Sequence, residues 1–237
     1  MADKKDEIVF ETVSAENIQT NNRTYLLYGA PGMGKTSTIK FLPGKTLLLD
    51  VDRTSHVLKG CPNIDIMYVD NTNTWEYWEK LIIHLKDNCE AYDNIVVDNI
   101  SELERSILSD LGSKGKNKGV PYQADYQYMQ FRIVNSLRYM KKLNVNLIWT
   151  AWEITDLYTD SGGQQWNRSF PQINGKILNN VLGLCDIVGK LSINSEGKRG
   201  FVLSATNSIY AKNQIDSRVG CLQNELMVWS DDDGKVN

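Results

Sequence analysis

The segment Gly29–Thr36 constrains this 237-residue chain more than any other, because Gly-Ala-Pro-Gly-Met-Gly-Lys-Thr fits the pattern G-x-x-x-x-G-K-[ST] in full. An apolar run, Thr24–Tyr28, precedes it, and a helical stretch, Lys35–Leu42, follows and stops at Pro43-Gly44. A strand, a glycine-rich turn and a helix in this order can wrap backbone N–H groups around an anion. The sequence therefore predicts a phosphate-binding loop that holds a nucleotide.

The chemistry of this loop predicts ATP and Mg²⁺ as the cofactors. Lys35 is expected to reach the β and γ phosphates, and the Thr36 hydroxyl is expected to ligate the metal ion. The residues expected to contact the nucleotide are Gly29, Ala30, Pro31, Gly32, Met33, Gly34, Lys35, Thr36 and Ser37.

Strand and helix patterns alternate along the rest of the chain. Apolar strand runs are Thr46–Val51, Asn94–Asp98 and Val145–Thr150, and helical spacing marks Trp75–Asn88, Ser101–Leu111 and Tyr122–Leu143. Residues 186–193 and 200–205 alternate around Asn194–Gly197, as in an antiparallel hairpin at a sheet edge. The expected fold is α/β, a mostly parallel sheet flanked by helices with an antiparallel edge hairpin.

Length and charge favour one domain that spans residues 1–237. Residues 1–22 are expected to form a flexible arm, and residues 230–237 an acidic tail. The net charge of −3 gives no sign of wholesale electrostatic binding to nucleic acid or membranes. No stretch approaches the ~18 consecutive apolar residues of a membrane span, and the charged start is unlike a signal peptide, so a cytoplasmic location is expected.

Hydrolysis needs acids beyond the phosphate loop. Asp98 ends the apolar run Ile95–Val97 and is predicted to hold Mg²⁺ together with Thr36. Many ATPases of the AAA type carry a catalytic glutamate directly after this acid, whereas Asn99 follows here. The group that activates water must lie elsewhere, and Asp52 and Glu153 are the two candidates because each follows a predicted strand.

The motifs resemble the RecA-like core, most closely the small phage members known as Sak-type single-strand annealing proteins, over residues 24–220. This resemblance implies a RecA-like P-loop NTPase fold, with Asp52 in place of the glutamate that activates water. It implies a polar sensor at Thr150 or Trp152. It also implies that Lys212, in Ala211–Ile215, reaches the γ-phosphate of a neighbouring subunit, with Arg218 as a possible substitute.

The same resemblance implies two loops that contact DNA. The segment Gly112–Val120 carries Lys114, Lys116 and Lys118 without an acid, which suits phosphate contacts. Residues 155–175 have no period and are expected to form a long loop, in which Trp166, Arg168 and Phe170 could stack on unpaired bases. A solvated connection and a lid anchored on the core are the plainer alternatives for these two loops.

The leading hypothesis is a DNA-stimulated ATPase with Lys35, Asp52, Asp98 and Lys212 as catalytic residues. It would bind single-stranded DNA and promote annealing or strand pairing in phage recombination, within the host cytoplasm. The implied partners are single-stranded DNA, further copies in a ring or filament, and a single-strand binding protein. A small-molecule or nucleotide kinase and a degenerate P-loop scaffold or loader remain the alternatives, because other enzyme classes share this loop.

Overall fold

Strand β1 (Thr24–Gly29) lies at the middle of a mostly parallel sheet, in a computed structural model that describes residues 12–17 and 22–228. The sheet has the order β10-β8-β7-β1-β5-β4-β2-β3, with β6 paired to β5 and β9 paired to β7. Strands β3, β2, β4, β5, β1 and β7 run parallel, so their carboxyl ends share one edge. This arrangement confirms the predicted α/β fold of a P-loop NTPase.

The remaining elements follow in chain order. The other strands are β2 Thr46–Asp50, β3 Ile64–Tyr68, β4 Asn94–Asp98, β5 Asn146–Thr159, β6 Gln165–Pro171, β7 Ile187–Ile193, β8 Arg199–Val202, β9 Lys212–Asn213 and β10 Gly220–Leu222. The helices are α1 Lys35–Thr38, α2 Thr74–Asn88, α3 Ile100–Lys114, α4 Gln123–Met140 and α5 Gly175–Leu184, with 3₁₀ turns η1 Ala15–Asn17, η2 Ile39–Phe41, η3 Ser55–Leu58 and η4 Gln223–Glu225.

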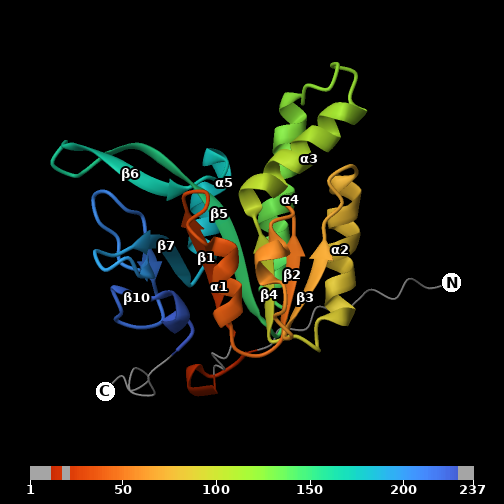
Figure 1. Cartoon of the computed structure of the whole chain (residues 1–237). Coiled ribbons are helices and arrows are strands. Elements are labelled where there is room, and N and C mark those ends of the chain that lie inside the picture. Colours follow the sequence, from red (N-terminus) through yellow and green to blue (C-terminus); the bar gives the residue numbers. More distant parts are fainter. Residues whose placement is uncertain (1–11, 18–21, 229–237) are drawn as a thin grey trace.

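The two faces of the sheet are covered by different elements because successive side chains of a strand point to opposite faces. Leu26 and Tyr28 of β1 pack in a cluster that includes residues of α2, α3, α4 and α5. Tyr25 and Leu27 of the same strand pack in a second cluster with η2, η3 and the hairpin β7–β8. Helix α1 therefore lies on one side of the sheet and the larger helices on the other (Figure 1).

The prediction of a loop over residues 155–175 is wrong. Strand β5 runs on to Thr159, turns at residues 160–164 and pairs antiparallel with β6 from Glu153↔Pro171 to Thr159↔Gln165. We call residues 153–171 the arm, because they project beyond the sheet (Figure 1). The many polar residues hid the strand pattern, since both faces at the tip of the arm are open to solvent.

One helix boundary and the place of the hairpin in the sheet differ from the expectations. Helix α3 continues to Lys114, so the predicted loop Gly112–Val120 begins three residues too early. The hairpin β7–β8 forms as predicted, but β7 pairs with β1 and β10 pairs with β8, so this hairpin is not the outermost part of the sheet. The flexible N-terminal segment predicted for residues 1–22 lies largely outside the described residues, and the acidic tail predicted for residues 230–237 lies outside them entirely.

Besides the short strands β9 and β10 and the 3₁₀ turns, one strand and one helix have no counterpart in the expectations. Strand β3 carries Asp65 and lies half-exposed at the sheet edge, where an apolar pattern is weak. Helix α5 is short, and its polar residues Asn179 and Asn180 interrupt the apolar spacing. Within the described part of the chain, no helix has the length and apolarity that crossing a membrane requires.

Candidate active site

The phosphate loop leaves β1 and enters α1 at the carboxyl edge of the sheet. Gly32 has φ 77° and Gly34 has φ 100°, and these left-handed conformations favour glycine. The Lys35 ammonium donates to the Gly29 carbonyl at 2.9 Å and to the Ala30 carbonyl at 3.1 Å. Burial lowers the pKa of Lys35, so this cation already sits in a partly desolvated position beside the loop.

Asp98 lies at the end of β4, next to the phosphate loop. Its carboxylate is 1% exposed and accepts from the Thr36 hydroxyl at 2.6 Å. It also accepts from the Thr150 hydroxyl. Burial raises the pKa of Asp98 to about 6. Strand β5 lies between β1 and β4, and this order brings Thr150 beside Asp98.

Asp52 follows β2 and faces the same cavity. Its carboxylate accepts from the Thr54 hydroxyl at 2.8 Å and from the Asn99 side-chain amide at 2.6 Å. Burial raises the pKa of Asp52. The hydrogen bonds from Thr54 and Asn99 and the nearby charge of Lys35 act in the opposite direction and favour the ionised carboxylate. The carboxylate is thus oriented by two short side chains and keeps access to the cavity.

Glu153, the other candidate for activating water, has a different environment. It forms an ion pair of 2.8 Å with Lys190, and both side chains are mostly buried. Lys190 also donates to the Ser169 hydroxyl at 2.9 Å. The ion pair links β5 to β7 at the base of the arm, so Glu153 has a cationic partner, whereas the hydrogen-bond partners of Asp52 are uncharged.

A cavity of about 320 Å³ is lined by residues of the phosphate loop together with Asp52 and Asp98. Its lining residues are Pro31, Gly32, Gly34, Lys35, Thr36, Ser37, Asp52, Thr54, His56, Val57, Asp98, Asn99 and Trp152. Most of the predicted loop residues and both acids thus meet in one place. Thr54, His56 and Val57 also line the cavity, although no motif in the sequence singles out these residues after β2.

The oxygen atoms of Thr36 and Asp98 suit Mg²⁺. Mg²⁺ is usually bound through one or two carboxylates together with substrate phosphates and water. A hydroxyl and a buried carboxylate 2.6 Å apart beside a phosphate loop provide this donor set. When bound, the ion would neutralise phosphate charge, while the protein's own contribution is to hold these two oxygens together.

Two C-terminal residues support the phosphate loop from outside its motif. Arg199 of β8 donates to the Met33 carbonyl at 2.9 Å. Gln223 of η4 donates to the Gly34 carbonyl at 2.9 Å and to the Thr38 hydroxyl at 2.8 Å. These contacts join positions more than 160 residues apart, and no local pattern in the sequence announces them.

Lys212 and Arg218 have partners within their own chain. The Lys212 ammonium donates to the carbonyls of Leu182, Gly183 and Cys185 at 3.1, 3.3 and 2.7 Å. These carbonyls close the C-terminus of α5, where a cation is favourable. Arg218 forms an ion pair with Asp216 at 2.7 Å. Within its own chain the Lys212 ammonium thus caps α5, and its reach to a neighbouring subunit stays a prediction.

The three lysines at and after the end of α3 have different surroundings. Lys114 forms an ion pair with Asp110 at 2.8 Å and donates to the Asn73 side chain at 2.5 Å, so its charge is compensated within the fold. Lys116 and Lys118 lie in the exposed connection between α3 and α4. The three lysines thus differ in environment, and their contact with DNA stays a prediction.

The arm carries an aromatic face around Arg168. The register pairs Tyr158↔Trp166, Asp156↔Arg168 and Ile154↔Phe170 put these side chains on one face of the arm. The Arg168 guanidinium lies 4.3 Å from the Tyr158 ring centroid and 5.6 Å from that of Phe170. Phe170 also stacks on Tyr210, with centroids 5.8 Å apart.

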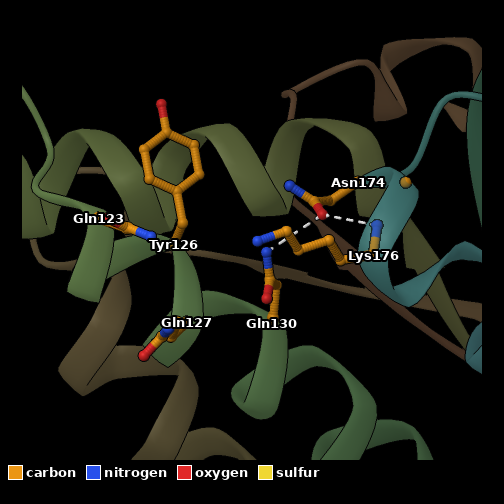
Figure 2. A pocket seen from close by; sticks show the side chains of 7 residues that line it. Gln123, Tyr126, Gln127, Gln130, Asn174 and Lys176 are labelled. Carbon is orange, nitrogen blue, oxygen red and sulfur yellow. Dashed lines mark hydrogen bonds between the residues drawn. The ribbon is translucent and has the colours of Figure 1, made fainter.

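A groove opens between the N-terminal parts of α4 and α5 (Figure 2). Its first part has a volume of about 530 Å³ and is lined by Gln123, Tyr126, Gln127, Gln130, Asn174, Gly175 and Lys176. It continues past Gln130 and Lys176 into a second hollow, where Arg138 and Asn180 add a cation and an amide. No acidic residue is among those that line either part.

Comparison with known proteins gives one family. The family model described as an AAA domain matches residues 21–215, which covers most of the chain and includes the phosphate loop, Asp52 and Asp98. No curated protein matches the sequence.

Proposed function

Since the chain belongs to the AAA domain family, we propose that it hydrolyses ATP and couples this reaction to the binding of single-stranded DNA. The observation that carries the proposal is the convergence of Lys35, Thr36, Asp52 and Asp98 on one cavity. Lys35 binds the β and γ phosphates, Thr36 and Asp98 hold Mg²⁺, and Asp52 orients the attacking water. Asp52 is preferred to Glu153 because Glu153 is bound to Lys190.

The proposed DNA site is the groove between α4 and α5, with Lys116 and Lys118 at one end and the arm near the other. Glutamine and asparagine amides can pair with base edges, and Tyr126 offers a partly exposed ring for stacking. Lys176 and Arg138 supply cations for phosphates. Trp166, Arg168 and Phe170 of the arm extend the same kind of surface.

Annealing or strand pairing in phage recombination is the role proposed for this activity. Assembly into a ring or filament would place several such grooves along one DNA strand. A single-strand binding protein would be the partner that hands over the DNA. This part of the proposal rests on the resemblance to Sak-type proteins.

The test is phosphate release from Mg-ATP with and without single-stranded DNA, over a range of protein concentrations. Stimulation by DNA that rises cooperatively with protein concentration is expected, and Lys35→Ala should abolish nucleotide binding. ATP binding without phosphate release would favour the scaffold or loader. Turnover that DNA does not change would favour a kinase and prompt a search for a small-molecule acceptor.

A further inference from the structure

Glu104 of α3 is a buried acid that the hydrolysis chemistry does not use. Its side chain is 7% exposed, and no ion pair involves it within the described residues. Burial raises its pKa to about 8. A buried acid without a cationic partner is costly, so its position calls for a specific role.

The contacts of Glu104 lead to the groove. Both carboxylate oxygens accept from the Asn174 backbone N–H, at 3.2 and 3.0 Å. Asn174 caps α5, since its side-chain oxygen accepts from the Lys176 backbone N–H at 3.1 Å. The same oxygen accepts from the Gln130 side chain of α4 at 3.2 Å (Figure 2). Glu104 thus fixes the residue that joins the two walls of the groove.

The N-terminus of α3, one turn before Glu104, contacts the nucleotide site. Asn99 caps α3 by accepting from the Glu102 backbone N–H at 2.8 Å, while its amide donates to Asp52. Ser101 accepts from the Trp152 backbone N–H at 3.0 Å and donates to the Gln172 carbonyl at 2.7 Å. The first turns of α3 therefore contact the cavity on one side and the chain that leads into α5 on the other.

We propose that Glu104 is a positioning residue that transmits the state of the nucleotide site to the groove between α4 and α5. A bound nucleotide, its Mg²⁺ and the water that Asp52 would orient compete for groups that bind one another in this structure, namely Thr36 with Asp98 and Asp52 with Asn99. Releasing Asn99 from Asp52 frees the start of α3 to shift, and Glu104 carries this shift to Asn174. The identity of the groove's ligand rests on the proposed function, but the link between the two sites does not.

The test uses hydrogen exchange of the backbone amides at residues 174–178 in the full chain, with and without a non-hydrolysable ATP analogue. In the wild type, the analogue should change the exchange rates of these amides several-fold. Glu104→Ala should bind the analogue with a Kd within about twofold of the wild type and lose most of the change at α5. Glu104→Gln, which keeps an oxygen acceptor, should retain a larger part of it.

Glu102→Gln is the matched control, because Glu102 lies on the same helix and its carboxylate contacts only Ser106 among the described side chains. It should leave the response at α5 intact. Glu104→Gln also guards against a folding defect in Glu104→Ala. The proposal is overturned if the analogue binds the wild type without changing α5, or if Glu104→Ala keeps the full change.

Binding of a single-stranded oligonucleotide separates this proposal from the proposed function. The analogue should alter the oligonucleotide Kd of the wild type by about 5- to 150-fold, the usual range of coupling between sites, and by much less in Glu104→Ala. If no oligonucleotide binds while α5 still responds through Glu104, the DNA function fails and the link between the sites stands. If the oligonucleotide binds and its Kd responds equally in both proteins, the link is wrong.

Discussion

The Asn99 side-chain amide lies 2.6 Å from the Asp52 carboxylate and ties the residue after Asp98 to the acid that follows the neighbouring strand β2. Asn99 therefore occupies the position where many AAA ATPases carry a glutamate, but it orients a carboxylate that comes from another strand. The same side chain caps α3. One residue thus contributes to both the geometry of the site and the start of the helix behind it.

Replacing Asp52 by asparagine should lower kcat for ATP hydrolysis by about 10²- to 10⁴-fold, the usual contribution of a positioned acid or base. The Kd for ATP should stay within a few-fold, because Lys35 and the loop remain in place. Single-turnover hydrolysis and equilibrium binding measure the two quantities separately. Glu153→Gln is the comparison, and an equally large loss of kcat there with Asp52→Asn active would transfer the role to Glu153.

Thr150→Val should destabilise the nucleotide-free protein by about 1 to 3 kcal/mol, because it removes a donor from a buried carboxylate while keeping the shape of the side chain. Asp98 would keep only the Thr36 hydroxyl and the longer contact from Thr54 at 3.5 Å. Urea unfolding at neutral pH measures the loss. An unchanged midpoint would mean that Thr150 does not hold Asp98 in solution.

Local patterns predicted the parts of this molecule that depend on neighbours in sequence. The phosphate loop, the strand ending at Asp98 and the parallel sheet each follow from spacing and hydrophobic runs. The placement of Asp52 at the same edge follows from the rule that parallel strands share their carboxyl ends. These features need no knowledge of distant contacts.

Distant contacts account for what the sequence did not predict. Gln223 supports the phosphate loop from the other end of the chain, and Lys212 caps α5, a contact that no sequence motif predicted. The arm was predicted as a loop because Trp166, Arg168 and Phe170 alternate with polar residues on a strand open to solvent. For Gln223 and Lys212 the partner is supplied by tertiary packing, which a linear pattern cannot express, whereas the arm is a local hairpin whose exposure hid its strand pattern.

Lys212→Met should lower the free energy of unfolding by about 1 kcal/mol, because the cation at the end of α5 is lost. The kcat for ATP hydrolysis should not change. A role in trans predicts the opposite result, a large loss of kcat with normal stability. Phosphate release at high protein concentration, with Lys142→Met as an exposed control, tells the two apart.

Neutralising Lys116 and Lys118 to glutamine should weaken binding of single-stranded DNA and lower the slope of log K against log salt by about 1.4, or 0.7 per phosphate contact. Lys86→Gln with Lys142→Gln is a control of equal charge change, since both lysines are exposed near the C-terminal ends of α2 and α4. Titrations at several salt concentrations measure the slope. If both double variants lower it equally, the connection between α3 and α4 has no special contact with DNA.

Glu104→Gln should remove a pH dependence of stability. Burial raises the pKa of Glu104 from 4.5 to about 8, so between these values the folded protein holds a proton that the unfolded chain has released. Stability from this group is complete below about pH 4.5 and declines by up to about 1.4 kcal/mol per pH unit as the pH rises toward 8.

The unfolding free energy of the wild type minus that of Glu104→Gln should therefore decrease, even to negative values, from pH 5 to 8. Above pH 8 it should level off. Urea denaturation at four or five pH values measures it. Asp98, whose pKa is also raised by burial, titrates in both proteins and cancels from the difference. A difference that stays constant from pH 5 to 9 would mean that Glu104 ionises in the folded protein as it does in the unfolded chain.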